Sequence, residues 1–214
     1  STRKESSAAS DVYKRQYIIN RIAKNLREER HKKGSISFNK KEVKFVLNKE
    51  KEPIKTVIKE SLAENKLIEE FMLLANKKVA SLFIKHKNGL FRIHDYPDDQ
   101  KIIILERIIK KLGYKLNLRN TKNINNQLNL LLKQTENSPE KNLIDTLVIR
   151  SMSKAKYSTK NIGHFGLSFE KYTHFTSPIR RYPDVLVHRE LERILTNKKK
   201  TQNLEKLCLH CSTR

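Results

Sequence analysis

The stretch Tyr172-Thr-His-Phe-Thr-Ser-Pro-Ile-Arg-Arg-Tyr-Pro-Asp184 is the most informative part of this chain of 214 residues. It places hydroxyl groups, aromatic rings and two adjacent guanidinium groups in one short segment. Arg180 and Arg181 each offer a planar set of donors that matches phosphate oxygens, while Pro178 and Pro183 restrict the backbone that carries them. A surface turn with two solvated arginines is the competing interpretation. The neighbouring residues favour a loop that holds phosphate.

This loop and several other segments resemble the signature of the ribonuclease II/ribonuclease R (RNB) family of exoribonucleases. The other segments are His164-Phe-Gly-Leu167, Gly34-Ser-Ile-Ser-Phe38, Leu67-Ile-Glu-Glu-Phe-Met-Leu-Leu-Ala-Asn76, Arg92-Ile-His-Asp-Tyr-Pro97 and Leu147-Val-Ile-Arg-Ser-Met152. The last two match the ribonuclease R pattern more closely than that of ribonuclease II. The likeness runs from about Arg21 to Arg214, and it implies an α+β fragment of the RNB catalytic domain, predominantly helical with a few short strands.

The resemblance also implies a function for the parent protein. Members of the family degrade RNA processively from the 3′ end and release nucleoside 5′-monophosphates with the help of Mg²⁺. The expected partner is therefore the 3′ end of a single-stranded RNA, and we expect a monomer. A non-catalytic module that binds single-stranded RNA is the alternative, and metal-dependent turnover would separate the two.

The family's site residues can be carried over to matching positions of this chain. Arg180 would contact the scissile phosphate and stabilise the charge that develops in the transition state. Asp184 would orient Arg180 or Arg181 through a charge-assisted bond. The residues expected to bind RNA are Phe38, Glu69, His174, Thr176, Ser177, Arg181 and Tyr182.

Two of these positions have other interpretations on the residues alone. Glu69 and Glu70 lie in an apolar helical segment, where a carboxylate needs a lysine partner, solvent or a ligand to offset its burial. A ligand such as a ribose hydroxyl would let the protein distinguish RNA from DNA, and the resemblance gives that role to Glu69. Phe38 would stack on a base at the 3′ end, but a lone phenylalanine on a strand is also an ordinary core residue.

The sequence lacks the carboxylate cluster that a two-metal hydrolytic site needs. The aspartates after residue 16 are scattered: Asp95, Asp98, Asp99, Asp145 and Asp184. In the family, the metal ligands lie upstream of the region represented here, so we expect no metal ligand in this chain and an inactive fragment. A zinc site of His164, His174 and His188 lacks a recognised spacing. Cys208 and Cys211 have no second cysteine pair, which favours a short helix with two unreactive thiols.

Composition supports a polyanionic partner. The chain has 46 Lys and Arg against 23 Asp and Glu, a net charge of +23, although the abundance of lysine, isoleucine and asparagine is also typical of an AT-rich genome. A hydrophobic content of 37% suits one domain. The sequence shows neither a membrane span nor a signal peptide, so we expect a cytoplasmic protein without a membrane partner.

Residues 1–16 look foreign to the rest, because Asp11-Val-Tyr-Lys-Arg-Gln16 resembles translated sequencing-adapter DNA. Residues 17–214 are expected to be the C-terminal part of the RNB catalytic domain, truncated at both ends. Periodicity and end signals predict helices over residues 17–34, 67–83, 101–112, 140–157 and from 185 to 195, with Ser138 as an N-cap and Gly113 as a C-cap. Alternation predicts half-buried strands over residues 35–38 and 43–47, with Pro53 ending that pattern, and a strand over residues 90–94; residues 117–126 read as a loop.

Overall fold

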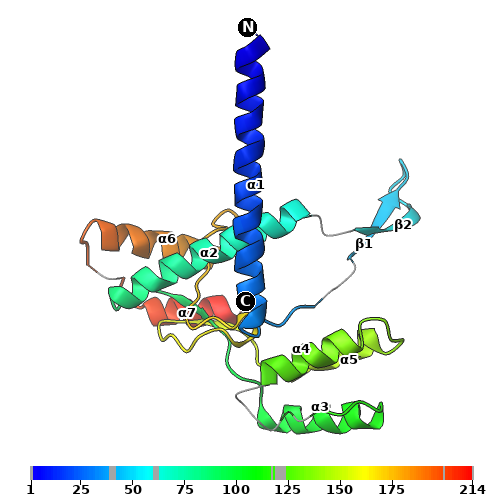
Figure 1. The fold of residues 1–214 in the computed structure, drawn as a ribbon. Helices are drawn as coiled ribbons and strands as arrows, with labels where there is room; N and C mark the ends of the chain where they lie inside the picture. The colour runs from blue at the N-terminus through cyan, green and yellow to red at the C-terminus, as the bar shows by residue number, and fades with distance from the viewer. Residues whose placement is uncertain are drawn as a thin grey trace. The chain divides into compact units, whose positions relative to one another are not determined.

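The computed structural model describes residues 2–38, 42–59, 63–116, 118, 124–199 and 201–213. The chain divides into two compact units, whose elements are labelled in Figure 1. The first unit comprises Ser1–Glu28 and Ser37–Phe71, and the second comprises Glu29–Ile36 and Met72–Arg214. Helices dominate, and the strands pair in two small antiparallel sheets, so the expected α+β class is confirmed.

The first helix, α1, spans Thr2–Lys32 and begins well before the predicted start at Tyr17. Residues 2–16 contain alanine, lysine, glutamate and arginine, which have high helix propensity, so the helix continues through the segment set aside as foreign. The origin of that segment stays a prediction. The helix ends before Gly34, as predicted, because the φ of 92° at this glycine is incompatible with a continuing right-handed helix.

Two strands of the first unit, β1 (Glu42–Leu47) and β2 (Pro53–Lys59), form an antiparallel hairpin. The turn between them is closed by the side chain of Asn48, whose Oδ1 accepts from the backbone N–H of Glu52 at 2.7 Å. The prediction of a strand was right, but that of half-burial was wrong, because Phe45, Val46 and Leu47 are all exposed. Alternation shows only which residues share a face, and Ile54 and Val57 on the partner strand are exposed as well.

The strand predicted for residues 35–38 does not form. The described backbone there has no ladder partner, and its polar groups bond to single sites instead. The N–H of Ile36 donates to the carbonyl of Gly166 at 2.9 Å, and the carbonyl of Ser35 accepts from the side chain of Asn129 at 3.1 Å. Phe38, at the end of this segment, is half-buried.

The core of the second unit is built by the end of α2 (Ala63–Lys85), the strands β3 (Phe91–Ile93) and β4 (Lys156–Ser158), and the helices α6 (Tyr182–Leu195) and α7 (Leu204–Thr213). β3 and β4 pair antiparallel, with Arg92 opposite Tyr157. Helix α6 starts at Tyr182, three residues before the prediction, because Pro183 suits the first turn of a helix. The buried residues are Ala80, Phe83, Leu90, Phe91, Ile93, Tyr157, Leu186, Val187, Leu204 and Cys208.

Three further helices of this unit lie together, drawn in green in Figure 1: α3 (Asp99–Lys111), α4 (Ile124–Gln134) and α5 (Lys141–Ser151). The predicted end signals of α3 are confirmed, since it stops before Gly113, where φ is 89°. α4 begins inside the predicted loop, because Ile124 is buried and starts its apolar face.

The helix after Ser138 begins within one residue of its predicted start at residue 140, but its predicted cap and its predicted end were wrong. Ser138 is not the N-cap, because its hydroxyl donates to the carbonyl of Thr135 at 3.1 Å, and Glu140 holds the cap position without a side-chain bond. The helix ends at Ser151 because Met152 is extended, with ψ of 151°. Tyr157 therefore lies on β4 rather than on a helix, where it pairs with β3.

The C-terminal cysteines lie on α7, as the sequence predicted. Both are free, Cys208 is buried and Cys211 is partly buried. Burial raises the pKa of the Cys208 thiol to about 12 and that of Cys211 above its ordinary value, so both stay protonated at neutral pH. Among the described residues, no helix is both long and apolar enough to cross a membrane.

Candidate nucleic-acid interface

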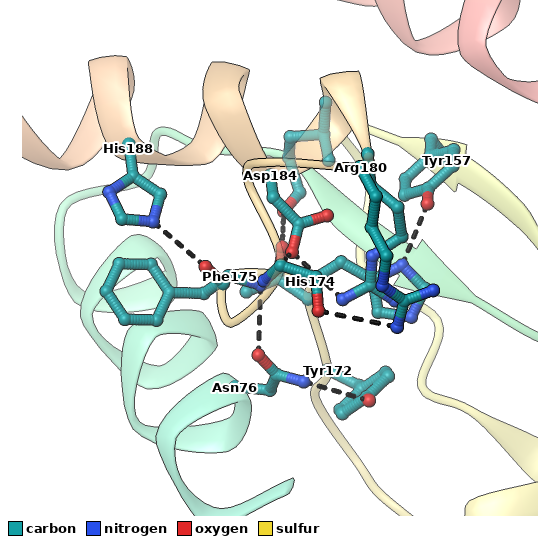
Figure 2. Close-up of polar contacts among 12 residues, drawn as sticks. Asn76, Tyr157, Tyr172, His174, Phe175, Arg180, Asp184 and His188 are labelled. Atoms are coloured by element: carbon teal, nitrogen blue, oxygen red, sulfur yellow. Dashed lines mark hydrogen bonds and ion pairs between the residues drawn. The ribbon is translucent and has the colours of Figure 1, made fainter. Parts of the chain in front are cut away.

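The segment from Tyr172 to Asp184, called here the arginine loop, runs from the end of an irregular stretch into the first turn of α6. Its first half is tied to α2 by one amide, as Figure 2 shows: the side chain of Asn76 donates to the Tyr172 hydroxyl at 3.0 Å and accepts from the Phe175 N–H at 2.9 Å. Thr173, fully buried, donates its hydroxyl to the carbonyl of Leu90 at 2.6 Å. These bonds fix the backbone before the arginines.

The second half of the loop is held by Asp184, which is fully buried in the first turn of α6. Its Oδ1 accepts from the backbone N–H of Ser177 at 2.8 Å and from Arg181 Nη2 at 2.9 Å. The positive end of the helix also favours a carboxylate at this place. Asp184 therefore orients Arg181, one of the two arginines between which the sequence left the choice open.

Arg180 is held much less tightly than its neighbour. Its side chain is exposed and approaches the Ser177 hydroxyl at 3.5 Å, the limit of a hydrogen bond. The preceding Ile179 is 101% exposed, so this end of the loop projects from the unit. One guanidinium is thus fixed within the protein and the other is presented to solvent.

His174 brings a neutral ring to the same place. Its Nδ1 lies 2.8 Å from the hydroxyl of Tyr157. Burial, followed by the positive charges of Arg181 and Arg92, lowers its pKa to about 3. The imidazole therefore carries no charge at neutral pH and acts as a hydrogen-bonding group, not as a cation.

The three histidines of the hypothetical zinc site are committed to other partners. His164, whose pKa burial lowers to about 3, accepts at Nδ1 from the Leu167 N–H at 3.3 Å, and Nε2 of His188 lies 2.9 Å from the carbonyl of Phe175. Rings stack edge to face from His164 to Tyr172 and on to His174, with centroids 5.4 and 5.5 Å apart. This is the pattern of a packed aromatic row.

The carboxylates of the described residues do not suit a metal ion. No three histidine, cysteine or carboxylate side chains in the described ranges come close enough to hold one. Asp184 is occupied by Arg181, and Asp145 pairs with Lys141 at 2.8 Å. These side chains therefore do not form a metal site.

The predicted site residues fall into two groups. The structure brings together His174, Thr176, Ser177, Arg180, Arg181 and Tyr182 on the arginine loop. Phe38 and Glu69 belong to the first unit: Phe38 is half-buried, Glu69 is exposed on α2, and the adjacent Glu70 is 3% exposed. The Glu69 side chain therefore lies at the surface of α2.

Sequence reasoning gave no role to three residues that build this site. Asn76 is a buried polar residue in an apolar helix, so the argument applied to the two glutamates would have found it. Arg92 stands opposite Tyr157 on the two-stranded sheet, and its guanidinium carbon lies 4.6 Å from the centre of that ring. Tyr157 was hidden by the wrong helix prediction, and no local pattern signals its contact with His174.

The sequence of this chain matches a known protein family. The model of a family described as the RNB domain matches residues 2–197. The chain belongs to the RNB family. Ribonuclease R of Thermotoga maritima is 38% identical over 205 residues, which are 90% of this chain and 29% of the relative. Ribonuclease R of Aquifex aeolicus is 40% identical over 172 residues, 79% of this chain and 24% of the relative.

A solved structure of an RNB protein has the same fold. Mycoplasma genitalium RNase R, in complex with ribose-methylated single-stranded RNA, superposes with a TM-score of 0.78 at 28% identity; the match covers 91% of this chain and 32% of that one. The chain thus spans about a quarter to a third of the length of these relatives.

Proposed function

We propose that this chain forms the RNA-gripping part of a processive 3′-to-5′ exoribonuclease that hydrolyses single-stranded RNA to nucleoside 5′-monophosphates. The observation that carries the proposal is the arginine loop, where a chain of the RNB family holds one guanidinium in place and presents a second to solvent. Phosphodiester groups are the ligands that such donors match.

The unequal anchoring of the two arginines supports different roles. Arg180 contacts the scissile phosphate, because its donors are exposed. Its positive charge stabilises the negative charge that develops on the phosphate in the transition state. Arg181, aligned by Asp184, holds the adjacent backbone. The neutral His174 and the hydroxyl-bearing Thr176, Ser177 and Tyr182 complete the grip.

The first unit contributes recognition of the nucleotide itself. Glu69 accepts hydrogen bonds from ribose hydroxyls. Phe38 stacks on a base at the 3′ end, and its ring, which is half-buried, must become more exposed to do so. In the complete enzyme Mg²⁺ would activate the attacking water. The aspartates after residue 16 are scattered, and we propose on this ground that the chain alone is inactive. We further propose a monomeric, cytoplasmic enzyme.

RNA binding in the presence of a chelator tests the grip without the chemistry. Arg180→Ala is expected to weaken the binding of a labelled oligoadenylate about tenfold, since a charge-assisted hydrogen bond is lost. Arg189→Ala is the matched control, because this exposed arginine lies further along α6. Glu69→Gln should reduce the preference for RNA over the equivalent DNA. Equal affinities for all three variants and the unchanged chain would contradict the proposed grip.

The chemistry is tested separately. With Mg²⁺ the purified chain should release no mononucleotide, whereas a fusion to the upstream region of a ribonuclease R should release them and lose this activity on Arg180→Ala. Mononucleotides released by the chain alone, and lost on Arg180→Ala, would show that the fragment is active. The coding region upstream of Tyr17 decides the remaining alternative: an intact frame without clustered aspartates would make this a non-catalytic RNA-binding module.

A further inference from the structure

A third arginine, Arg92, approaches the arginine loop from the two-stranded sheet. Its backbone N–H donates to the carbonyl of Tyr172 at 2.9 Å, at the start of the loop. Its side chain lies over the ring of Tyr157, the residue opposite it on β4, with 4.6 Å between the guanidinium carbon and the ring centre. A flat guanidinium on an aromatic face keeps its in-plane donors available for another partner.

Tyr157 joins this arginine to the loop. Its hydroxyl lies 2.8 Å from His174 Nδ1, and the charges of Arg92, Arg180 and Arg181 all act on the His174 ring. The positive charges of three guanidinium groups therefore act on one neutral imidazole. Like charges repel one another, and a bound anion would offset that repulsion.

The described residues supply little negative charge to balance this cluster. Asp184 faces it, and that carboxylate is paired with Arg181. None of the ion pairs formed within the described ranges involves Arg92. Three buried polar atoms of the loop have no hydrogen-bond partner: the donors Thr176 Oγ1 and Arg181 Nε and the acceptor Asp184 Oδ2. The half-buried Arg92, outside these ion pairs, and the two unpaired donors favour an anionic ligand.

We propose that Arg92 is a second phosphate-binding residue, which holds the phosphodiester adjacent to the one at Arg180. The inference rests on the proposed function and extends it by one nucleotide. Tyr157 is the positioning residue: its ring carries the guanidinium of Arg92 and its hydroxyl sets the orientation of His174. The site recognises RNA through its backbone, so binding here does not depend on base sequence.

The salt dependence of RNA binding measures the number of phosphates that a protein neutralises. For single strands, the slope of log affinity against log salt changes by about 0.7 for each phosphate contact. Binding of labelled oligoadenylate by the 214-residue chain in a chelator is measured between roughly 50 and 200 mM salt. Arg92→Ala is expected to reduce the slope by about 0.7 and to weaken binding about tenfold.

Three variants separate phosphate binding from support of the fold. Arg107→Ala, at an exposed arginine of α3, is the matched control and should change the slope far less. Arg92→Lys keeps the charge and loses the planar donors, so the slope should persist while affinity falls. Tyr157→Phe keeps the ring under Arg92 and removes the bond to His174, so it too should keep the slope.

The outcome is read against Arg180→Ala. If Arg180→Ala reduces the slope and Arg92→Ala behaves like Arg107→Ala, Arg92 serves only to brace Tyr157 and the inference is wrong. If neither Arg180→Ala nor Arg92→Ala changes the slope, the proposed function itself fails. Should Arg92→Ala not fold, Arg92→Lys decides: reduced affinity at an unchanged midpoint of thermal unfolding supports the inference, and unchanged affinity overturns it.

Discussion

The described residues form two antiparallel strand pairs that differ in what surrounds them. In β3–β4, Phe91 is 4% exposed and belongs to the core that α6 and α7 complete. In β1–β2, Phe45 is 63% exposed and Ile54 is 67% exposed, in a hairpin of similar alternating sequence. Local pattern is thus enough to form a strand pair, while burial depends on helices that come from elsewhere in the chain.

The difference explains where the candidate site is found. Three-residue strands are too short to be stable alone, and β3 and β4 form because their side chains enter a core. That packing fixes Arg92 and Tyr157 next to the arginine loop. The longer β1–β2 hairpin has its own turn and ladder.

The largest effect should come from removing one phenylalanine from each strand pair. Phe91→Ala empties buried volume against Phe83, whose ring centre is 6.3 Å away, and should lower the free energy of unfolding by about 3–5 kcal/mol. Phe45→Ala, the matched change on the exposed hairpin, should change it by less than about 0.5 kcal/mol. Urea unfolding of both variants measures this. Equal losses of stability would mean that other residues pack on Phe45 and that the β1–β2 hairpin is not exposed.

A smaller effect is expected from acid, and it should arise in the second unit. The pKa of His174 is lowered from 6.5 to about 3, so between these values the unfolded chain binds a proton that the folded chain does not. Its contribution to stability is therefore complete above pH 6.5 and is lost as the pH falls, by roughly 2 kcal/mol at pH 5.

Unfolding in urea at several pH values between 7 and 5 checks this. His174→Gln removes one of two such groups and should make the dependence less steep, while the lowered pKa of His164 keeps part of it. His86→Gln, just after α2, should leave the dependence as in the unchanged chain. A dependence that is equally steep in His174→Gln would show that the group titrates normally in the folded protein.

The sequence predicted the parts of the fold that depend on neighbours along the chain. α3 follows from its apolar face and from Gly113, which comes just after the helix; the cap at Asp98, whose Oδ1 accepts from the N–H of Gln100 at 3.0 Å, was not predicted. The arginine loop follows from its own residues. The contacts that position it span the chain: Asn76 and Tyr172 are 96 residues apart, and β3 and β4 are joined only by tertiary packing.

For this reason the helix prediction that ran through Tyr157 failed. Residues 152–157 have no strong local preference that outweighs the ladder formed with β3, so tertiary pairing decides their structure. Exposure of Phe45 was unpredictable for the same reason. A period of two shows which side chains share a face, and only the rest of the fold determines whether that face is covered.

The smallest expected effect tests a single hydrogen bond beside β3. Thr173→Val preserves shape and removes the hydroxyl that donates to the carbonyl of Leu90, which leaves a buried acceptor without that donor and should cost about 1–2 kcal/mol in urea unfolding. Thr146→Val makes the same change on the exposed face of α5, where water replaces the bond to the carbonyl of Asn142, and should change stability by less than about 0.5 kcal/mol. If the two losses are equal, burial in the second unit does not strengthen its polar contacts, and the contrast between the two strand pairs is one of apolar packing alone.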